Sequence, residues 1–262
     1  MNEIPCGDIW NEVKNMEWSH RTSWAAEDVA FAPKRRVQNR GSNKRPHVIG
    51  AFYSAKMDRI IEYESLNEYL FLGILELDPR TARYYVQPVA IPVPVGSDSE
   101  GEATWPHVVD VLVFRDGHRP CLYDIKSPDD PAAAKAIART RPSCERYAAV
   151  RGWGYEVAYP RQMPLIVAKN VKRLLAFTRP RSGTPEWEAV ILARAAQSEP
   201  CTIAELAVAG EPRLSAGHLL PVVYHLIARG QLAVDLHQLI DSATVVRLPQ
   251  ADDTREGWMG WR

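Results

Sequence analysis

Three carboxylates and one lysine in the first half of the chain have the residue types that phosphodiester chemistry needs. Glu68 lies in a run predicted to be helical, and Asp110 lies in the valine-rich run 108–114. Asp124 and Lys126 end a second apolar run. Carboxylate oxygens suit Mg²⁺, which neutralises phosphate charge and lowers the pKa of a bound water. The ammonium could orient that water, stabilise developing charge or, if burial lowered its pKa, act as a base.

Two short strands joined by a turn would bring these groups together. Asp110 is the only polar residue within 108–114, and a charge in such a run is costly to bury without a partner or a metal. Residues 115–119 carry a hairpin turn signal, and Asp124 and Lys126, two apart, share one face of the following strand. Any one acid could equally be an edge position or a cap, and acid-x-lysine is a common tripeptide. The hypothesis therefore depends on the ordered set.

A helix over residues 65–77 would carry Glu68. Ser65 is a favourable N-cap and Glu68 occupies the third helical position, which is the spacing of a capping box. This spacing offers a purely structural alternative to metal binding, and on spacing alone the two interpretations are equal. The residues predicted to form the core face of the helix are Leu66, Tyr69, Leu70 and Ile74.

Three further motifs stand around these residues. They are FYSAKMDRIIEYES over residues 52–65 followed by Glu68, LELDP over 75–79, and YYVQP over 84–88. With them, the chain from about residue 50 to about residue 170 resembles the TnsA endonucleases, one subunit of a two-part cut-and-paste transposase. The family more often has Pro-Asp or Thr-Asp at the central aspartate, whereas Val109 precedes Asp110 here.

The resemblance implies a fold, a site and a cofactor. The fold is α/β, with a restriction-endonuclease-like core in which helices flank a mixed sheet. The implied metal ligands are the side chains of Glu68, Asp110 and Asp124 and the main-chain carbonyl of Ile125. Lys126 matches the catalytic lysine, and Gln87 matches a glutamine near the active site. The implied cofactor is Mg²⁺, for which Mn²⁺ should substitute.

The resemblance also implies a function within a larger assembly. The chain would hydrolyse the non-transferred strand of double-stranded DNA at the transposon 5′ ends, and so produce simple insertions. Its partners would be a DDE transposase of the TnsB type and an ATP-dependent regulator of the TnsC type. Two alternatives stay open, namely a stand-alone restriction-like nuclease or resolvase, and a non-catalytic assembly module. The complete set of four site residues argues against the non-catalytic module.

Composition bounds the setting in which the chain works. Its 262 residues have a formal net charge of zero, which is unusual for a lone DNA binder and favours recruitment by partners. The four cysteines are scattered without zinc-finger spacing, so buried thiols are expected, and there is no Gly-rich phosphate loop. There is no apolar run of membrane-spanning length and no signal peptide, so we expect no membrane contact and a cytoplasmic, bacterial nucleoid-associated protein.

A basic stretch precedes the predicted catalytic region. Residues 33–57 contain no acid, and such a segment can follow phosphates without reading sequence. A solvated basic loop is the alternative. The predicted DNA-binding residues are Lys34, Arg35, Arg36, Arg40, Lys44, Arg45 and Lys56, with Arg59 and Gln87 added by the family motifs.

The remaining elements suggest three regions. Residues 1–50 are predicted to be an N-terminal arm with some helix and the basic segment, 51–178 the catalytic domain, and 179–262 a winged-helix-like domain. The elements predicted for the catalytic domain include strands over 83–95, 155–159 and 165–168 and a helix over 131–151 that Pro142 kinks or splits. The last domain is predicted to contain helices over 186–196, 202–207 and 214–229 and strands over 231–236 and 242–248. The third of these helices has few basic side chains, which favours protein contact over the reading of DNA bases.

Overall fold

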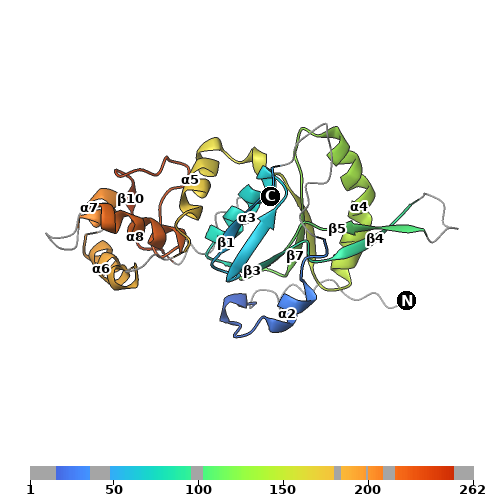
Figure 1. Ribbon diagram of the computed structural model, residues 1–262, viewed down its shortest axis with the longest axis horizontal. Helices are drawn as coiled ribbons and strands as arrows, with labels where there is room; N and C mark the ends of the chain where they lie inside the picture. Colours follow the sequence, from blue (N-terminus) through green and yellow to red (C-terminus); the bar gives the residue numbers. More distant parts are fainter. Residues whose placement is uncertain are drawn as a thin grey trace. The chain divides into compact units, whose positions relative to one another are not determined.

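The computed structural model describes residues 16–35, 48–95, 103–179, 184–198, 200–208 and 216–250. The fold is mixed α/β, with a mixed sheet flanked by helices (Figure 1). The chain divides into two compact units built from separate segments, 1–51 with 61–68 and 81–160, and 52–60 with 69–80 and 161–262. The predicted divisions after residues 50 and 178 stay predictions.

A four-stranded sheet forms the centre of the first unit. Its order is β3 (Thr81–Val86), β6 (Val111–Arg115), β7 (Cys121–Ile125) and β8 (Gly154–Ala158). Strand β6 runs antiparallel to β3 and β7, whereas β7 and β8 are parallel. Helix α4 (Pro131–Ala149) makes the crossover between the parallel strands, as such a connection requires. The helix continues through Pro142, so the predicted split there is wrong, whereas the alternative of a kink stays a prediction.

A two-stranded ribbon lies beyond an interruption in the β3–β6 pair. Strand β4 (Ala90–Pro94) pairs antiparallel with β5 (Thr104–Val108), and α4 packs against β4 (Figure 1). At the interruption Gln87 has a φ of 50°, and its N–H donates to the carbonyl of Asp110 at 2.8 Å. The single strand predicted over 83–95 is thus two strands, and Asp110 precedes β6 instead of lying inside a strand.

The described part of the N-terminal arm packs on the sheet of its own unit. It contains a 3₁₀ turn, η2 (Trp18–His20), and a short helix, α2 (Ala25–Ala30). The rings of Trp18 and Trp24 each lie edge-on to Phe114, with centroids 5.0 Å apart. The described part of the arm is therefore docked on its own unit.

A hairpin and a helix follow the arm. Strands β1 (Gly50–Ser54) and β2 (Arg59–Tyr63) pair with each other, and α3 (Leu66–Leu77) begins three residues after β2. The predicted core face of α3 is correct for Leu70 and Ile74, which are buried. It is wrong for Leu66, which is 44% exposed.

The second unit has an apolar core that combines distant segments. Leu70 and Ile74 of α3 pack with Val171 and Leu174 of α5 (Leu165–Leu175). A short 3₁₀ turn, η3 (Pro160–Gln162), precedes α5. The strand predicted over 165–168 is wrong, because these residues form the first turn of α5.

Three helices and a small amount of strand complete the second unit. The elements are α6 (Thr184–Gln197), β9 (Cys201–Thr202), α7 (Ile203–Ala207), α8 (Ala216–Ala228) and β10 (Val245–Val246). Thr202 and Glu205 form the predicted capping box of α7. The predicted pairing of 231–236 with 242–248 is reduced to one bridge between Ala233 and Arg247, while β10 pairs with β9. Among the described residues, no helix is long and apolar enough to cross a membrane.

Candidate functional site

Asp110 and Lys126 lie together where β6 begins and β7 ends. The antiparallel register pairs Val111 with Tyr123, which brings the start of β6 beside the end of β7. Asp110 Oδ2 accepts hydrogen bonds from the N–H of Ile125 at 2.6 Å and from Lys126 Nζ at 3.2 Å. Lys126 Nζ is also 3.9 Å from Asp124 Oδ1. The hairpin thus brings together the two acids and the lysine that the sequence singled out.

Asp124 is fully buried and is held by two side chains. His107 Nε2 lies 3.1 Å from Oδ1 and 2.9 Å from Oδ2, and the Tyr155 hydroxyl donates to Oδ2 at 2.7 Å. Burial alone would raise the pKa of Asp124. The His107 hydrogen bond and the charge of Lys126 outweigh it, so the pKa is lowered and the carboxylate stays ionised.

Glu68 has the capping role that its spacing allowed, while its metal-binding role stays a prediction. Ser65 Oγ accepts from the N–H of Glu68 at 3.1 Å and donates to Glu68 Oε1 at 3.1 Å. Glu68 Oε2 accepts from the N–H of Glu64 at 2.8 Å, which completes a variant of the capping box. Burial and the charge of Asp110 also raise the pKa of Glu68 to about 7. Glu68 therefore caps α3 while lying within electrostatic reach of Asp110.

The charges of this cluster do not balance. Three carboxylates, those of Glu68, Asp110 and Asp124, interact with the single ammonium of Lys126. Burial raises the pKa of Asp110, and Asp124 adds to the effect, although Lys126 opposes it. Burial alone would lower the pKa of Lys126, but the two aspartates outweigh it and raise that pKa. A charged lysine fits hydrogen-bond donation, whereas the base role would require a lowered pKa.

A second set of contacts surrounds Gln87. Its side-chain amide is oriented so that both the nitrogen and the oxygen have hydrogen-bond partners. The nitrogen donates to the carbonyl of Arg35 at 2.9 Å, and the oxygen accepts from Arg35 Nε at 3.2 Å. Arg35 also forms an ion pair with Glu64, and the N–H of Lys34 donates to the carbonyl of Gln87 at 2.9 Å. Gln87 is buried, so in this structure it anchors residues 34 and 35 and is not presented to a ligand.

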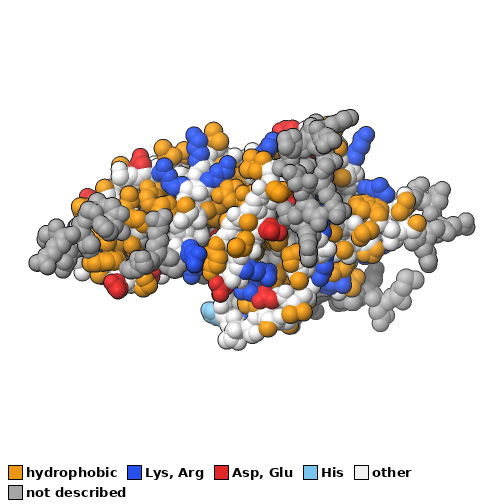
Figure 2. Space-filling model, in the orientation of Figure 1, with side chains coloured by type: hydrophobic (Ala, Val, Ile, Leu, Met, Phe, Trp, Pro, Cys, Tyr) orange, Lys and Arg blue, Asp and Glu red, His pale blue; other side chains and the backbone are white. Residues whose placement is uncertain are grey.

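The other predicted DNA-binding residues have separate locations. Lys34 is exposed, and its ammonium donates to the carbonyl of Ala30 at 2.8 Å. Lys56 and Arg59 are half-buried in the second unit, where the Lys56 ammonium donates to the carbonyl of Asp78. On the face shown in Figure 2, Lys and Arg side chains lie in several separate groups among acidic and apolar ones. The predicted DNA-binding residues that lie outside the described residues are Arg36, Arg40, Lys44 and Arg45.

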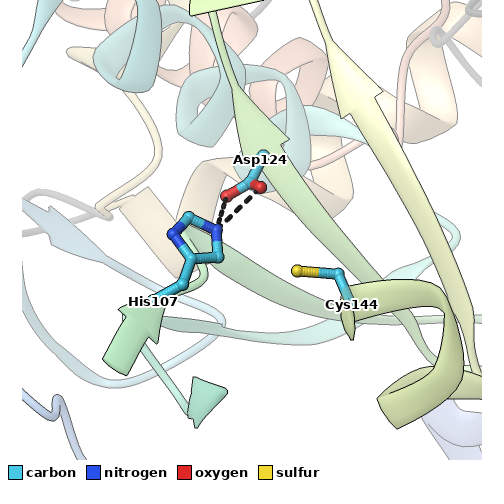
Figure 3. A group of neighbouring side chains, drawn as sticks. All are labelled: His107, Asp124 and Cys144. Carbon is cyan, nitrogen blue, oxygen red and sulfur yellow. Dashed lines mark hydrogen bonds and ion pairs between the residues drawn. The ribbon is translucent and has the colours of Figure 1, made fainter. Parts of the chain in front are cut away.

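Three residues contact the site without having been predicted as site residues. His107 lies on β5, Cys144 on α4 and Tyr155 on β8. The position of His107 three residues before Asp110 is a signal in the sequence that it could face the site. Cys144 and Tyr155 gave no local signal. Figure 3 shows the imidazole of His107 against the carboxylate of Asp124, with the thiol of Cys144 pointing toward them.

Two of the three described cysteines confirm the expectation of buried thiols, and the third does not. Cys144 and Cys201 are buried, and Cys121 is half-buried. Burial raises the pKa of the Cys144 thiol to about 12, and the charge of Asp124 adds to the effect. Cys6 lies outside the described residues.

Comparison with known proteins adds no family assignment. No protein-family model matches the chain, and no curated protein matches it. The resemblance to the TnsA endonucleases therefore depends on the motifs of residues 52–88 and on the four site residues.

Proposed function

We propose that the chain is a metal-dependent DNA endonuclease of the TnsA type, which hydrolyses the non-transferred strand at transposon 5′ ends. The observation that carries this proposal is the convergence of Asp110, Asp124 and Lys126 at adjacent ends of β6 and β7. Glu68, close enough for Asp110 to raise its pKa, adds the third carboxylate. The mixed sheet flanked by helices supports a restriction-endonuclease-like core.

The donor set fits a hard divalent cation such as Mg²⁺, with Mn²⁺ as a substitute. Glu68, Asp110 and Asp124, with the carbonyl of Ile125, would hold the ion, because oxygen ligands suit it. Burial, and after it the charge of a neighbouring carboxylate, raises the pKa values of Glu68 and Asp110, and a divalent cation would offset both effects. When bound, the ion would neutralise phosphate charge and lower the pKa of a water.

The protein groups around this set have separable roles. Lys126, held protonated between Asp110 and Asp124, would donate a hydrogen bond to the attacking water or to a phosphate oxygen. His107 and Tyr155 would keep Asp124 ionised and fixed in orientation. A carboxylate held in this way needs no reorientation to bind an ion.

The second unit supports a role in assembly. The order helix α6, strand β9, helices α7 and α8, and a bridged pair of segments supports the proposal of a winged-helix-like module. Helix α8 has no Lys, Arg, Asn or Gln, the side chains that most often read bases. We therefore propose that this unit binds protein partners, with a DDE transposase subunit and an ATP-dependent regulator as the candidates.

One observation favours a second candidate, a non-catalytic assembly module. Each carboxylate of the site already has hydrogen-bond partners within the protein: Ser65 for Glu68, Ile125 for Asp110, and His107 for Asp124. A cluster satisfied in this way could serve only to hold the fold.

The deciding experiment is a transposition assay with the DDE transposase and the regulator of the same element. Asp110→Ala is compared with Asp129→Ala, which removes an exposed acid just after β7. We expect sequencing to show that Asp110→Ala converts simple insertions into cointegrates while Asp129→Ala does not. Identical products from both variants would favour the assembly module. Nicking of plasmid DNA by the chain alone with Mg²⁺ would favour a stand-alone nuclease.

A further inference from the structure

An imidazole, a carboxylate and a thiol converge from three different elements of the first unit. They belong to His107 on β5, Asp124 on β7 and Cys144 on α4 (Figure 3). We propose that these three side chains form a binding site for a borderline-soft divalent ion such as Zn²⁺. This site shares Asp124 with the all-oxygen set of the proposed nuclease but adds a nitrogen and a sulfur ligand, and it does not depend on that function.

The geometry of the three ligand atoms is close to what zinc requires. They all lie within 4.8 Å of one another, and His107 Nε2 is 2.9 Å from Asp124 Oδ2. Tetrahedral zinc with bonds of about 2.0–2.3 Å places its ligands roughly 3.3–3.8 Å apart. An ion would therefore separate the imidazole from the carboxylate by a few tenths of an ångström and draw the thiol inward.

The surroundings of the cluster also suit a bound ion. Asp124 and Cys144 are fully buried, so ordered elements fix their positions. The His107 side chain is 14% exposed, which leaves a side open to solvent from which an ion and a fourth, water ligand could come. The Tyr155 hydroxyl donates to Asp124 Oδ2 at 2.7 Å and would orient the carboxylate from outside the ligand set, as such partners commonly do.

The ligand types decide which ion would bind. A thiolate and an imidazole select zinc or cobalt over magnesium, whose preferred ligands are oxygens. Binding would displace the thiol proton to solvent, because the thiolate is the ligand form. His107 Nε2 would also give up the proton that it donates to Asp124, so that the ring proton is carried by Nδ1. Since Asp124 also belongs to the proposed magnesium set, Zn²⁺ bound here would withdraw it from that set.

Cobalt(II) is the probe that tests the site directly. A thiolate bound to cobalt gives a charge-transfer absorption band that nitrogen and oxygen ligands do not give. Full-length protein freed of metal is titrated with Co²⁺. We expect a thiolate-to-cobalt charge-transfer band that saturates at one equivalent and that Zn²⁺ displaces. Cys144→Ser should abolish the band. Cys121→Ser, the matched control, should keep it, because residues 121 and 124 lie on opposite faces of β7.

A second variant keeps the proposal testable if Cys144→Ser fails to fold. His107→Asn should retain the thiolate band but weaken Co²⁺ binding by more than about 10-fold, since even outer-shell changes commonly cost 10- to 100-fold. Circular dichroism of the metal-free variants checks folding. The proposal is overturned if the wild type gives no band, if Cys144→Ser keeps it, or if His107→Asn leaves the affinity unchanged. In those cases the three side chains form only a hydrogen-bonded support for Asp124.

Discussion

The protonation of the single residue Glu68 should give the metal-free protein a measurable pH dependence. Burial and the charge of Asp110 raise its pKa from 4.5 to about 7 in the folded chain. Over this range the folded state holds a proton that the unfolded state has released, so stability falls as the pH rises from about 5 to about 8. We expect Glu68→Gln to remove this decline, which for one proton is at most about 1.4 kcal/mol per pH unit.

Thermal unfolding in metal-free buffer across this pH range measures the effect. Glu62→Gln is the matched control, because Glu62 is an exposed acid on β2 in the same unit. At high pH, added Mg²⁺ should raise the thermal stability of the wild type more than that of Glu68→Gln. Equal slopes for the wild type and Glu68→Gln would show that Glu68 is not protonated in the folded protein.

Lys126 offers a second test at the residue scale, because its proposed role separates chemistry from ion binding. Lys126→Ala should lower strand cleavage by at least about 100-fold, since it removes a positioned donor. Mg²⁺ binding should persist, because the substitution takes positive charge away from Asp110 and Asp124. Nicking rates and calorimetric titration measure the two effects, with the exposed Lys135→Ala on α4 as the control. Lost Mg²⁺ binding would mean that the lysine mainly holds the carboxylates in place.

At the scale of elements, two helices with similar caps provide a matched pair. Ser65 caps α3 and Thr202 caps α7, so replacing either with Ala should cost about 1 kcal/mol of stability. Only Ser65 also donates to Glu68 Oε1, so only Ser65→Ala should change the Mg²⁺ affinity. Urea unfolding and Mg²⁺ titration of both variants check this. An equal change of affinity in the two variants would break the proposed link between the α3 cap and the metal set.

The elements that local sequence predicts well are those with caps and regular apolar spacing. Helix α3 and the capping box of α7 are of this kind. The run 165–168 is a failure, because a short apolar segment rich in branched residues fits strand and helix equally. Its helical spacing becomes visible only over a longer window, where Val167, Val171 and Leu174 are buried on one face.

The same limit applies to the candidate site. Asp110, Asp124 and Lys126 could be grouped from sequence because one hairpin joins them, and hairpin register follows from local turns. His107 and Tyr155 reach Asp124 from β5 and β8, across 17 and 31 residues of chain. Contacts of that range are set by tertiary packing, so residue spacing alone could not predict the partners of Asp124.

At the scale of the whole molecule, the second unit is not a separable C-terminal piece. Its core joins α3 and α5 to the helices that follow residue 183. The core residues before residue 180 include Leu70, Ile74, Leu77, Val167, Val171 and Leu174. Removal of the segment after residue 179 would expose these apolar side chains to water. The folded unit would then lose much of the hydrophobic burial that stabilises it.

A truncation pair tests this view of the second unit. A chain ending at residue 179 would lose the partners of Leu70, Ile74 and Leu174, so we expect a lower thermal midpoint, dye binding to exposed apolar surface, and aggregation. A chain ending at residue 250, which keeps every described residue, is the comparison. Scanning calorimetry and gel filtration compare the two, and equal midpoints would show that the core before residue 180 is self-sufficient. Partner binding by this unit is therefore better tested with substitutions of exposed residues, such as Leu239→Ser, than with deletions.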